Sequence, residues 1–284
     1  MPELPEVEVL IRHLAPLLVG RTIRSVGVSR PKVVRPAALR DFERALVGAR
    51  FEAMARRAKY LVFTLRPRGR GKPFVLAGHL GMTGRMYLAA ESTPLPKHAA
   101  VVLGLGRQSF IFEDTRYFGR LTLDTRSLEG LGPEPLGKEF TPEVLSAALR
   151  RSSQPIKVKL LDQTVVAGVG NIYASEALHR ARISPTLPAR RLSAAQVRRL
   201  WRAIRAVLRE AIACGSTVPL SYDGRGKRDG LFYFGRAADA EDYYEERLRV
   251  YDRKGEPCGK CGTPIQRLVQ AARSTFYCPE CQGR

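Results

Sequence analysis

Glu129-Gly130-Leu131-Gly132-Pro133-Glu134-Pro135-Leu136-Gly137 divides this 284-residue chain into two parts with different hydrophobic periods. Glycine and proline interrupt helices and strands, so this stretch predicts a linker. Before it, short apolar or alternating runs are separated by Gly, Pro and Arg/Lys clusters, a pattern typical of a sandwich or barrel. After it, apolar residues recur with helical spacing. The sequence therefore predicts an α+β protein with a β-rich first half and a helical second half.

The β-rich half is predicted to begin with a helix and to continue with short strands. Pro5 suits the first helical turn, Glu6 and Glu8 complement the positive helix end, and Gly20 ends the helix. The expected strands are Thr22–Val28, Tyr60–Leu65, Phe74–Leu80, Ala99–Leu105, Ser109–Phe112 and Leu121–Leu123.

Pro2, just before this helix, has two interpretations. If the initiator methionine is removed, Pro2 becomes a free secondary amine, and an α-amino group with a pKa of about 7.7–8.0 is partly unprotonated at neutral pH. Such an amine can attack a carbonyl-like carbon to give a Schiff base, with Glu3 as a nearby acid. In the alternative interpretation, Pro2 and Pro5 only lead into the helix and Glu3 only complements its positive end.

The charge of the chain points to a polyanionic partner. Lys and Arg total 48 against 27 Asp and Glu, a formal net charge of +21. Nucleic acid is the first candidate because binding phosphates releases counterions, and an anionic membrane surface is the second. We find no apolar run long enough to span a bilayer and no signal-peptide pattern, so we expect a cytoplasmic protein.

The cysteines predict one structural zinc ion. Cys258, Cys261, Cys278 and Cys281 form two C-x2-C pairs separated by 16 residues, and two such pairs complete a closed tetrahedral site. A redox pair or coincidence is the alternative. Thr275–Tyr277 reads as a strand, which favours a two-stranded zinc ribbon. Cys214 is expected to be a packed small hydrophobe.

The helical half carries two clear helix starts and one long loop. Thr141 with Pro142 predicts one helix, and Ser193 with Gln196 forms a capping-box pattern before an amphipathic helix that extends to Ile212. The glycine-rich, charged and aromatic stretch 221–246 has no clear period, and long loops in compact proteins are usually functional or disordered.

Three further segments combine glycine with residues suited to nucleic acid. In Gly168–Glu176, two glycines and an asparagine let backbone N–H groups approach a phosphate, or serve packing only. His79–Gly84 and Asp114–Gly119 each place a bulky residue beside glycine. Met and Phe wedges can fill a gap in a base stack and Arg can bind an orphaned base, although core packing is the alternative.

Together these segments resemble the formamidopyrimidine-DNA glycosylase family over essentially the whole chain. The matching segments, in the family's order, are residues 2–8, 56–61, 79–84, 131–136, 168–176, 253–258 and 273–278. The resemblance implies an N-terminal β-sandwich with flanking helices, and a helical helix–two-turn–helix domain that ends in a β-hairpin zinc finger. The implied bounds are 1–128 for the sandwich, 129–139 for the linker, 140–246 for the helical domain with a lesion-capping loop at about 221–246, and 247–284 for the finger.

The resemblance also implies roles for individual residues. Pro2 would be the nucleophile at C1′, Glu3 the acid, Lys59 the residue for β-elimination and Arg273 the residue for δ-elimination. Met82, Arg116 and Phe118 would fill the space left by the flipped nucleotide. The implied phosphate contacts are Lys157, Asn171 and Arg273, and the implied further DNA contacts are His98 and Arg151.

The implied function is a bifunctional DNA glycosylase/AP lyase of base excision repair. It would excise 8-oxoguanine and formamidopyrimidines from double-stranded DNA and cleave abasic sites as a monomeric, bacterial, nucleoid-associated enzyme with one Zn2+. An endonuclease VIII-like enzyme for oxidised pyrimidines and a non-enzymatic zinc-ribbon nucleic-acid-binding protein are the alternatives. Two departures stand out: Asp-Thr-Arg-Tyr-Phe-Gly at 114–119 replaces the usual Asp-Pro-Arg-Arg-Phe-Gly, and the stretch 221–246 is longer than usual, which bears on lesion preference.

Overall fold

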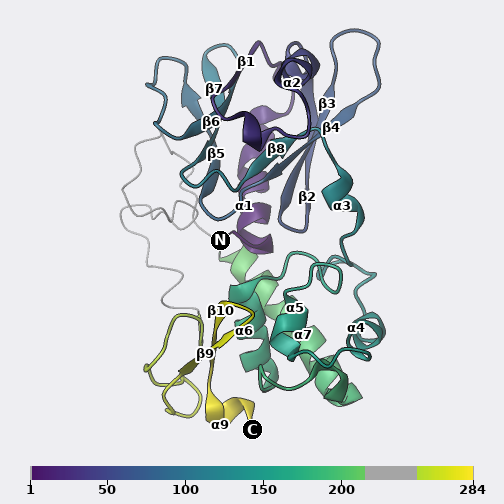
Figure 1. The fold of residues 1–284 in the computed structure, drawn as a ribbon, viewed down its shortest axis with the longest axis vertical. Helices are drawn as coiled ribbons and strands as arrows, with labels where there is room; N and C mark the ends of the chain where they lie inside the picture. The colour runs from purple at the N-terminus through teal and green to yellow at the C-terminus, as the bar shows by residue number, and fades with distance from the viewer. Residues whose placement is uncertain (1, 215–247, 284) are drawn as a thin grey trace. The chain divides into compact units, whose positions relative to one another are not determined.

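The computed structural model describes residues 2–214 and 248–283, which belong to two compact units (Figure 1). The first unit contains the described residues up to Glu129, and the second begins at Gly130. Each unit is described by itself. The predicted lesion-capping loop, 221–246, lies outside the described residues, and the finer domain bounds given above stay predictions.

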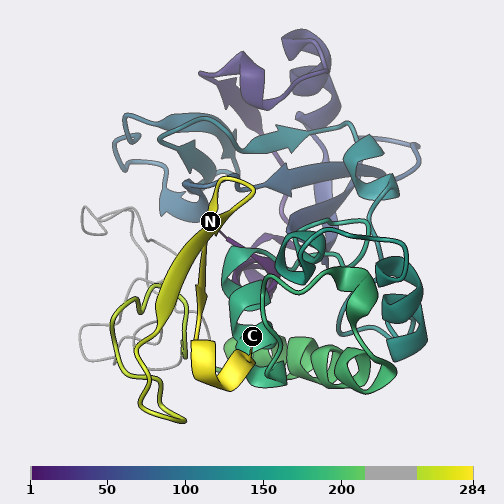
Figure 2. The same cartoon turned by 60° about the horizontal axis from the view of Figure 1, so that its bottom comes forward.

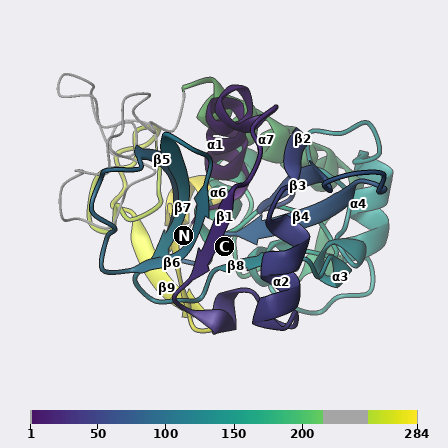
Figure 3. The same ribbon diagram turned by 90° about the horizontal axis from the view of Figure 1, so that it is seen from above.

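The N-terminal unit contains two four-stranded antiparallel sheets (Figure 3). One has the order β1-β6-β7-β5 and the other the order β2-β3-β4-β8. The strands are β1 (Ser25–Val28), β2 (Arg50–Arg57), β3 (Tyr60–Arg66), β4 (Phe74–His79), β5 (Gly84–Ala90), β6 (Ala99–Gly104), β7 (Gln108–Asp114) and β8 (Arg120–Thr122). The helices are α1 (Leu4–Leu18), α2 (Leu39–Leu46) and α3 (Arg126–Glu129), with a 3-10 turn, η1, at Pro31–Val33.

Three phenylalanine rings pack together in the core between the sheets. Phe63 of β3 lies edge-on to Phe110 of β7, with ring centroids 5.7 Å apart, and Phe51 of β2 contacts both rings. Edge-to-face packing of this kind adds to the stabilisation that burial provides. The predicted β-sandwich with flanking helices is therefore confirmed.

All six predicted strands overlap observed ones, but the sequence did not reveal β2, β5 or α2. The eight residues of β2 contain no β-branched side chain, and a register shift between Phe51 and Ala53 interrupts its alternation. Thr22, placed in the first predicted strand, forms only an isolated bridge with Arg50. Helix α1 begins at Leu4, with Pro5 in its first turn as expected.

The second unit is helical (Figure 2). Its helices are α4 (Pro142–Leu149), α5 (Ile156–Leu160), α6 (Asn171–Ala181) and α7 (Ala194–Ala213), with a 3-10 turn, η2, at Ala189–Arg191. The predicted cap of α4 by Thr141 and the capping box of α7 are both present. Cys214, at the end of α7, is half-buried.

The segment predicted as a linker packs closely against the helical unit. A side chain at Gly132 would meet the Thr164 carbonyl oxygen at 2.3 Å, and the Arg205 guanidinium donates to the carbonyls of Pro135 and Gly137. Glycine at position 132 is therefore required by a close backbone approach.

The finger follows as a two-stranded antiparallel ribbon, drawn in yellow in Figure 2. It consists of β9 (Gln266–Gln270) and β10 (Arg273–Tyr277), followed by the short helix α9 (Pro279–Gln282). Ala271 and Ala272, with φ of 48° and 57°, make the two-residue turn. The predicted β-hairpin is confirmed.

Candidate functional site

Pro2 and Glu3 lie at the start of helix α1 and are buried. Glu3 is the N-cap residue: its N–H donates to Glu6 Oε2 at 2.7 Å, and its own side chain completes a capping box with the Glu6 N–H. Both carboxyl groups are almost fully buried. The capping box holds the residue next to Pro2 in one conformation, so the start of the chain has a rigid support.

Lys59 lies in the two-residue turn between β2 and β3 and is 8% exposed. Arg56 connects this turn to α1, since its Nε donates to Glu8 Oε2 at 2.9 Å and its Nη1 to the Ala58 carbonyl at 3.1 Å. Burial opposes ionisation of Glu8, but hydrogen bonds from Arg56 and Arg12 outweigh it and lower the pKa of Glu8. The helix that begins beside Pro2 and the turn that carries Lys59 are therefore joined by an ion pair.

The three residues predicted to fill the gap in the base stack lie together. Arg116 Nη1 is 3.4 Å from Met82 Sδ, and the Arg116 guanidinium lies 4.8 Å from the ring centroid of Phe118. Met82 is 44% exposed and Phe118 is 52% exposed, which is unusual for such apolar side chains. We call Met82, Arg116 and Phe118 the wedge.

The fully buried Asp114 holds the two wedge loops together. It accepts hydrogen bonds from Thr83 Oγ1 at 2.6 Å, from the Gly119 N–H at 2.7 Å and from the Arg116 N–H at 3.1 Å. At Gly81, which has φ of 63°, a side chain would meet the Gly119 nitrogen at 2.7 Å. The two loops thus touch backbone to backbone. Because the Met82 and Phe118 side chains are exposed, the alternative that these segments serve only core packing does not describe them.

Two histidines flank the wedge loops. His98 Nδ1 lies 3.1 Å from the Tyr117 hydroxyl. His79 Nδ1 accepts the Gly81 N–H at 3.1 Å, and its ring contacts the Tyr60 ring at a tilt of 49°, with centroids 4.7 Å apart. Burial, helped by Lys59 and Arg120, lowers the pKa of His79 to about 4, so the ring is neutral at pH 7.

The supporting roles of His79 and Asp114 were missed in the sequence. Both residues lie within the two glycine-bearing segments noted there, so the signal was available. Their partners, however, become visible only when the two loops meet.

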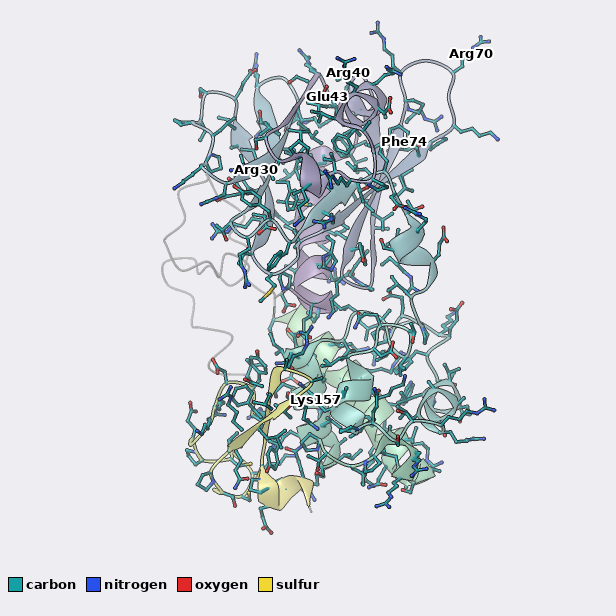
Figure 4. All side chains as sticks on the ribbon, viewed as in Figure 1. Arg30, Arg40, Glu43, Arg70, Phe74 and Lys157 are labelled. Atoms are coloured by element: carbon teal, nitrogen blue, oxygen red, sulfur yellow. The ribbon has the colours of Figure 1, made fainter. Side chains whose placement is uncertain are left out.

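In the helical unit, two predicted DNA contacts, Lys157 and Asn171, meet at the backbone of the finger hairpin. Lys157, which is labelled in Figure 4, is fully buried. Its ammonium donates to Asn171 Oδ1 and lies 3.5 Å from the Ser274 carbonyl oxygen. Asn171 Nδ2 donates to the same carbonyl at 2.9 Å. Ser274 follows the exposed Arg273 in β10. Lys157 and Asn171 therefore meet at the backbone of the finger hairpin, one residue after Arg273, and we call Lys157, Asn171 and Arg273 the phosphate cluster.

Arg151 does not join the phosphate cluster. It is exposed just after α4, and no hydrogen bond or ion pair among the described residues connects it to Lys157 or Asn171. Its predicted DNA contact stays a prediction.

The four finger cysteines fit a tetrahedral metal site. All four Sγ atoms lie within 4.8 Å of one another, and Zn–S bonds of about 2.3 Å would place them about 3.8 Å apart. A hydrogen bond from Thr263 lowers the pKa of Cys261 to about 6, whereas burial and the neighbouring sulfurs raise the pKa of Cys281 to about 12. The geometry of the four sulfur atoms fits one structural zinc ion, and within the described residues the cluster consists of these four cysteines.

Helix α6 attaches the finger to the helical unit through two buried side chains. Glu176 accepts the backbone N–H groups of Arg249, Val250 and Tyr251, each at 2.9 Å. Burial raises the pKa of Glu176 although these three bonds oppose the shift. One turn further on, His179 Nε2 lies 3.5 Å from Cys258 Sγ.

No helix within residues 2–214 and 248–283 combines the length and the hydropathy that crossing a membrane requires.

The sandwich, the helical unit and the cysteine finger define the class of zinc-finger DNA glycosylases. Residues 1–121 match the formamidopyrimidine-DNA glycosylase N-terminal domain, residues 131–221 the formamidopyrimidine-DNA glycosylase H2TH domain, and residues 255–283 the zinc finger found in FPG and IleRS. The chain belongs to the formamidopyrimidine-DNA glycosylase family. It is accordingly an enzyme of base excision repair with DNA glycosylase and AP lyase activity, and neither alternative function is favoured.

Full-length relatives agree with this assignment. Formamidopyrimidine-DNA glycosylase of Chloroflexus aurantiacus is 43% identical over 291 residues, which cover 99% of this chain and 98% of that protein. The Thermus thermophilus protein of the same name is 42% identical, covering 100% of this chain and 99% of that protein. The Lactococcus lactis Fpg in complex with abasic-site DNA superposes with a TM-score of 0.86 at 32% identity, covering 99% of this chain and 100% of that one.

Proposed function

We propose that this enzyme removes oxidised purines, 8-oxoguanine and formamidopyrimidines, from double-stranded DNA and then cleaves the strand at the resulting abasic site. Solved structures that resemble the chain contain N7-benzyl-Fapy-dG DNA, at 32% identity, and carbocyclic 8-oxoG DNA, at 33% identity. We further propose that it works as a monomer in the bacterial cytoplasm, where chromosomal DNA is its substrate.

The observation that carries the mechanism is the rigid support of Pro2 at the capped start of α1. With Met1 removed, the Pro2 amine attacks C1′ of the damaged nucleotide. The bond from C1′ to the base breaks, and Glu3 provides the proton that assists sugar opening and base loss. The product is a Schiff base between Pro2 and the sugar.

Strand cleavage follows from the chemistry of this Schiff base. It makes the 2′ proton acidic, so that Lys59 can serve β-elimination on the 3′ side and Arg273 can serve δ-elimination on the 5′ side. The wedge fills the space left by the flipped nucleotide, which offsets part of the few kcal/mol that unstacking costs. The phosphate cluster and His98 bind the DNA backbone.

Zinc has a structural part in this scheme. A site closed by four cysteines leaves no open coordination position. Its contribution is to fold the finger hairpin, which carries Arg273 and the Ser274 carbonyl.

The test is covalent trapping. Purified protein is incubated with a duplex that carries 8-oxoguanine opposite cytosine and is reduced with borohydride, which converts the Schiff base into a stable adduct. We expect strong trapping by the native protein and at least a hundredfold loss for Pro2→Gly and for protein that retains Met1, of the order expected when an activated nucleophile is lost. Pro5→Ala is the matched control, because Pro5 lies in the helix and not at the terminus.

Full trapping by Pro2→Gly would contradict the assignment of Pro2. A parallel excision assay on thymine glycol tests the endonuclease VIII-like alternative, and faster excision of thymine glycol than of 8-oxoguanine would contradict the proposed substrate.

A further inference from the structure

Arg30 is an exposed arginine that lies over the ring of Tyr117. Its guanidinium carbon is 4.8 Å from the ring centroid. Among the described residues no carboxylate forms an ion pair with Arg30, although most of the ion pairs involve arginine. A cation over an aromatic face is held in place while its N–H groups stay available to a further partner.

The backbone on both sides of this contact is fixed. The N–H groups of Ser29 and Arg30 both donate to the Ala100 carbonyl in β6, at 3.0 and 3.4 Å. At the start of the same strand, the His98 carbonyl accepts the Asp114 N–H at 3.1 Å. Because His98 Nδ1 also lies 3.1 Å from the Tyr117 hydroxyl, two segments of the chain, at Arg30 and at His98, converge on Tyr117.

Tyr117 lies inside the wedge loop, between Arg116 and Phe118. Its φ of 53° is a left-handed conformation that few non-glycine residues adopt. Arg116 lies over Phe118 within the loop, and Arg30 reaches Tyr117 from another segment of the chain, each guanidinium carbon 4.8 Å from its ring centroid. The first pair belongs to the wedge, and the second adds a cation whose aromatic partner is the residue between Arg116 and Phe118.

We propose that Arg30 binds a DNA phosphate beside the wedge and that Tyr117 is the residue that positions it. The inference rests on the wedge role given under Proposed function. The guanidinium fork matches two phosphate oxygens, and the stacked ring reduces the conformational freedom that binding would otherwise remove. The bulk charge of +21 on the chain suits such a contact.

Position 117 allows a direct test by rescue. The signature that residues 114–119 resemble carries arginine at this position, and this chain carries tyrosine. If Arg30 supplies a guanidinium from a neighbouring segment, an arginine introduced at 117 should replace it. We therefore expect the double variant Arg30→Ala/Tyr117→Arg to bind DNA about as tightly as the native protein. The single variant Arg30→Ala should bind more weakly than both.

The experiment measures Kd for a duplex with a tetrahydrofuran abasic analogue as a function of salt. Arg30→Ala should weaken binding about fivefold near 0.1 M salt and reduce the slope of log Kd against log salt by about 0.9, the contribution of one phosphate contact. Tyr117→Ala should behave like Arg30→Ala, and Tyr117→Phe, which keeps the ring, should bind nearly as the native protein does.

Arg70→Ala is the matched control. Arg70 is exposed in the loop between β3 and β4, well away from Arg30 within the same unit (Figure 4). Arg70→Ala removes the same charge as Arg30→Ala but at a distant position. It should therefore leave the DNA affinity and the salt slope almost unchanged. Equal losses for Arg30→Ala and Arg70→Ala would overturn the proposal, because only overall charge would then matter. Failure of Tyr117→Arg to restore the slope would also overturn it.

Borohydride trapping of the same protein variants on the 8-oxoguanine duplex separates this proposal from the mechanism, because the tetrahydrofuran analogue cannot form a Schiff base. If the Schiff-base mechanism is wrong, the native protein gives no trapped complex while the salt slopes still report on Arg30. If the native protein traps DNA and Arg30→Ala has the native slope, the role of Arg30 is wrong and the mechanism stands.

Discussion

Asp114 in the N-terminal unit and Glu176 in the helical unit are buried carboxylates that each accept three hydrogen bonds. The partners of Asp114 are close in sequence or on the adjoining loop, and they fix the shape of the wedge. The partners of Glu176 are backbone N–H groups that lie 73 to 75 residues away, where the finger begins. One carboxylate shapes a loop and the other joins two folded segments.

The difference teaches how each part of the site is held. The wedge loops remain attached to strands at both ends, so loss of Asp114 should disturb them locally. The start of the finger has no strand of the helical unit beside it among the described residues, and α6 supplies its attachment. Loss of Glu176 should therefore disturb more of the structure than loss of Asp114.

The largest effect is expected for Glu176→Ala. Each of three backbone N–H groups would lose its acceptor, at about 1–3 kcal/mol for a buried donor. We expect the free energy of unfolding to fall by about 3 kcal/mol or more, and limited proteolysis to cut the chain near 248–251. Urea denaturation and mass spectrometry of the fragments measure both.

Glu210→Ala is the control for this prediction. Glu210 is an exposed carboxylate of α7 that pairs with Arg180 at 2.8 Å, and surface pairs contribute at most about 1 kcal/mol. Equal destabilisation by Glu176→Ala and Glu210→Ala would show that α6 does not attach the finger in this way.

A smaller effect on stability, about 2 kcal/mol, is expected for Asp114→Ala, because Thr83 and Arg116 can turn to water once the carboxylate is absent. Its effect on function should be specific, since displaced wedge side chains no longer fill the stack. Single-turnover excision of 8-oxoguanine should slow by about tenfold to a hundredfold. The neighbouring Glu113→Ala, which removes only the acceptor of the Tyr87 hydroxyl, should not slow it; comparable slowing by both would contradict the role of Asp114.

These two carboxylates also show what the sequence could predict. The finger followed from cysteine spacing alone, because four thiolates in two close pairs have few other uses. The wedge residues lie beside glycine in segments that the sequence singled out, but their role came from the family resemblance, because the residues alone left core packing as the alternative. Asp114 lay in a segment already singled out, but its function depends on Thr83, which comes near only when two strands pair.

The role of Glu176 could not be predicted from the sequence, for a different reason. It ends the glycine-bearing segment that was interpreted as a phosphate approach, and nothing in that segment indicates a partner more than seventy residues away. Lys157 was predicted as a DNA contact, yet its full burial against Asn171 and Ser274 depends on where the hairpin docks. Strand β2 was missed because its residues suit a strand only through their packing partners.

The smallest effect is expected for a change at the second contact from α6, the one between His179 and Cys258. His179 Nε2 lies 3.5 Å from Cys258 Sγ, within reach of a hydrogen bond to this zinc ligand. Such outer hydrogen bonds orient metal ligands, and their loss typically costs tenfold or more in metal affinity. His179→Phe, which keeps a buried ring, should release zinc about tenfold faster to a chelating dye.

His13→Phe is the control for zinc release, because His13 is a half-buried histidine of α1 in the other unit. Equal release rates for the native protein and His179→Phe would mean that the ring packs against the finger without supporting the metal. If His179→Phe accelerates zinc release while its urea transition stays native, α6 holds the finger in two separable ways. Glu176 would then attach the chain, and His179 would support the metal site.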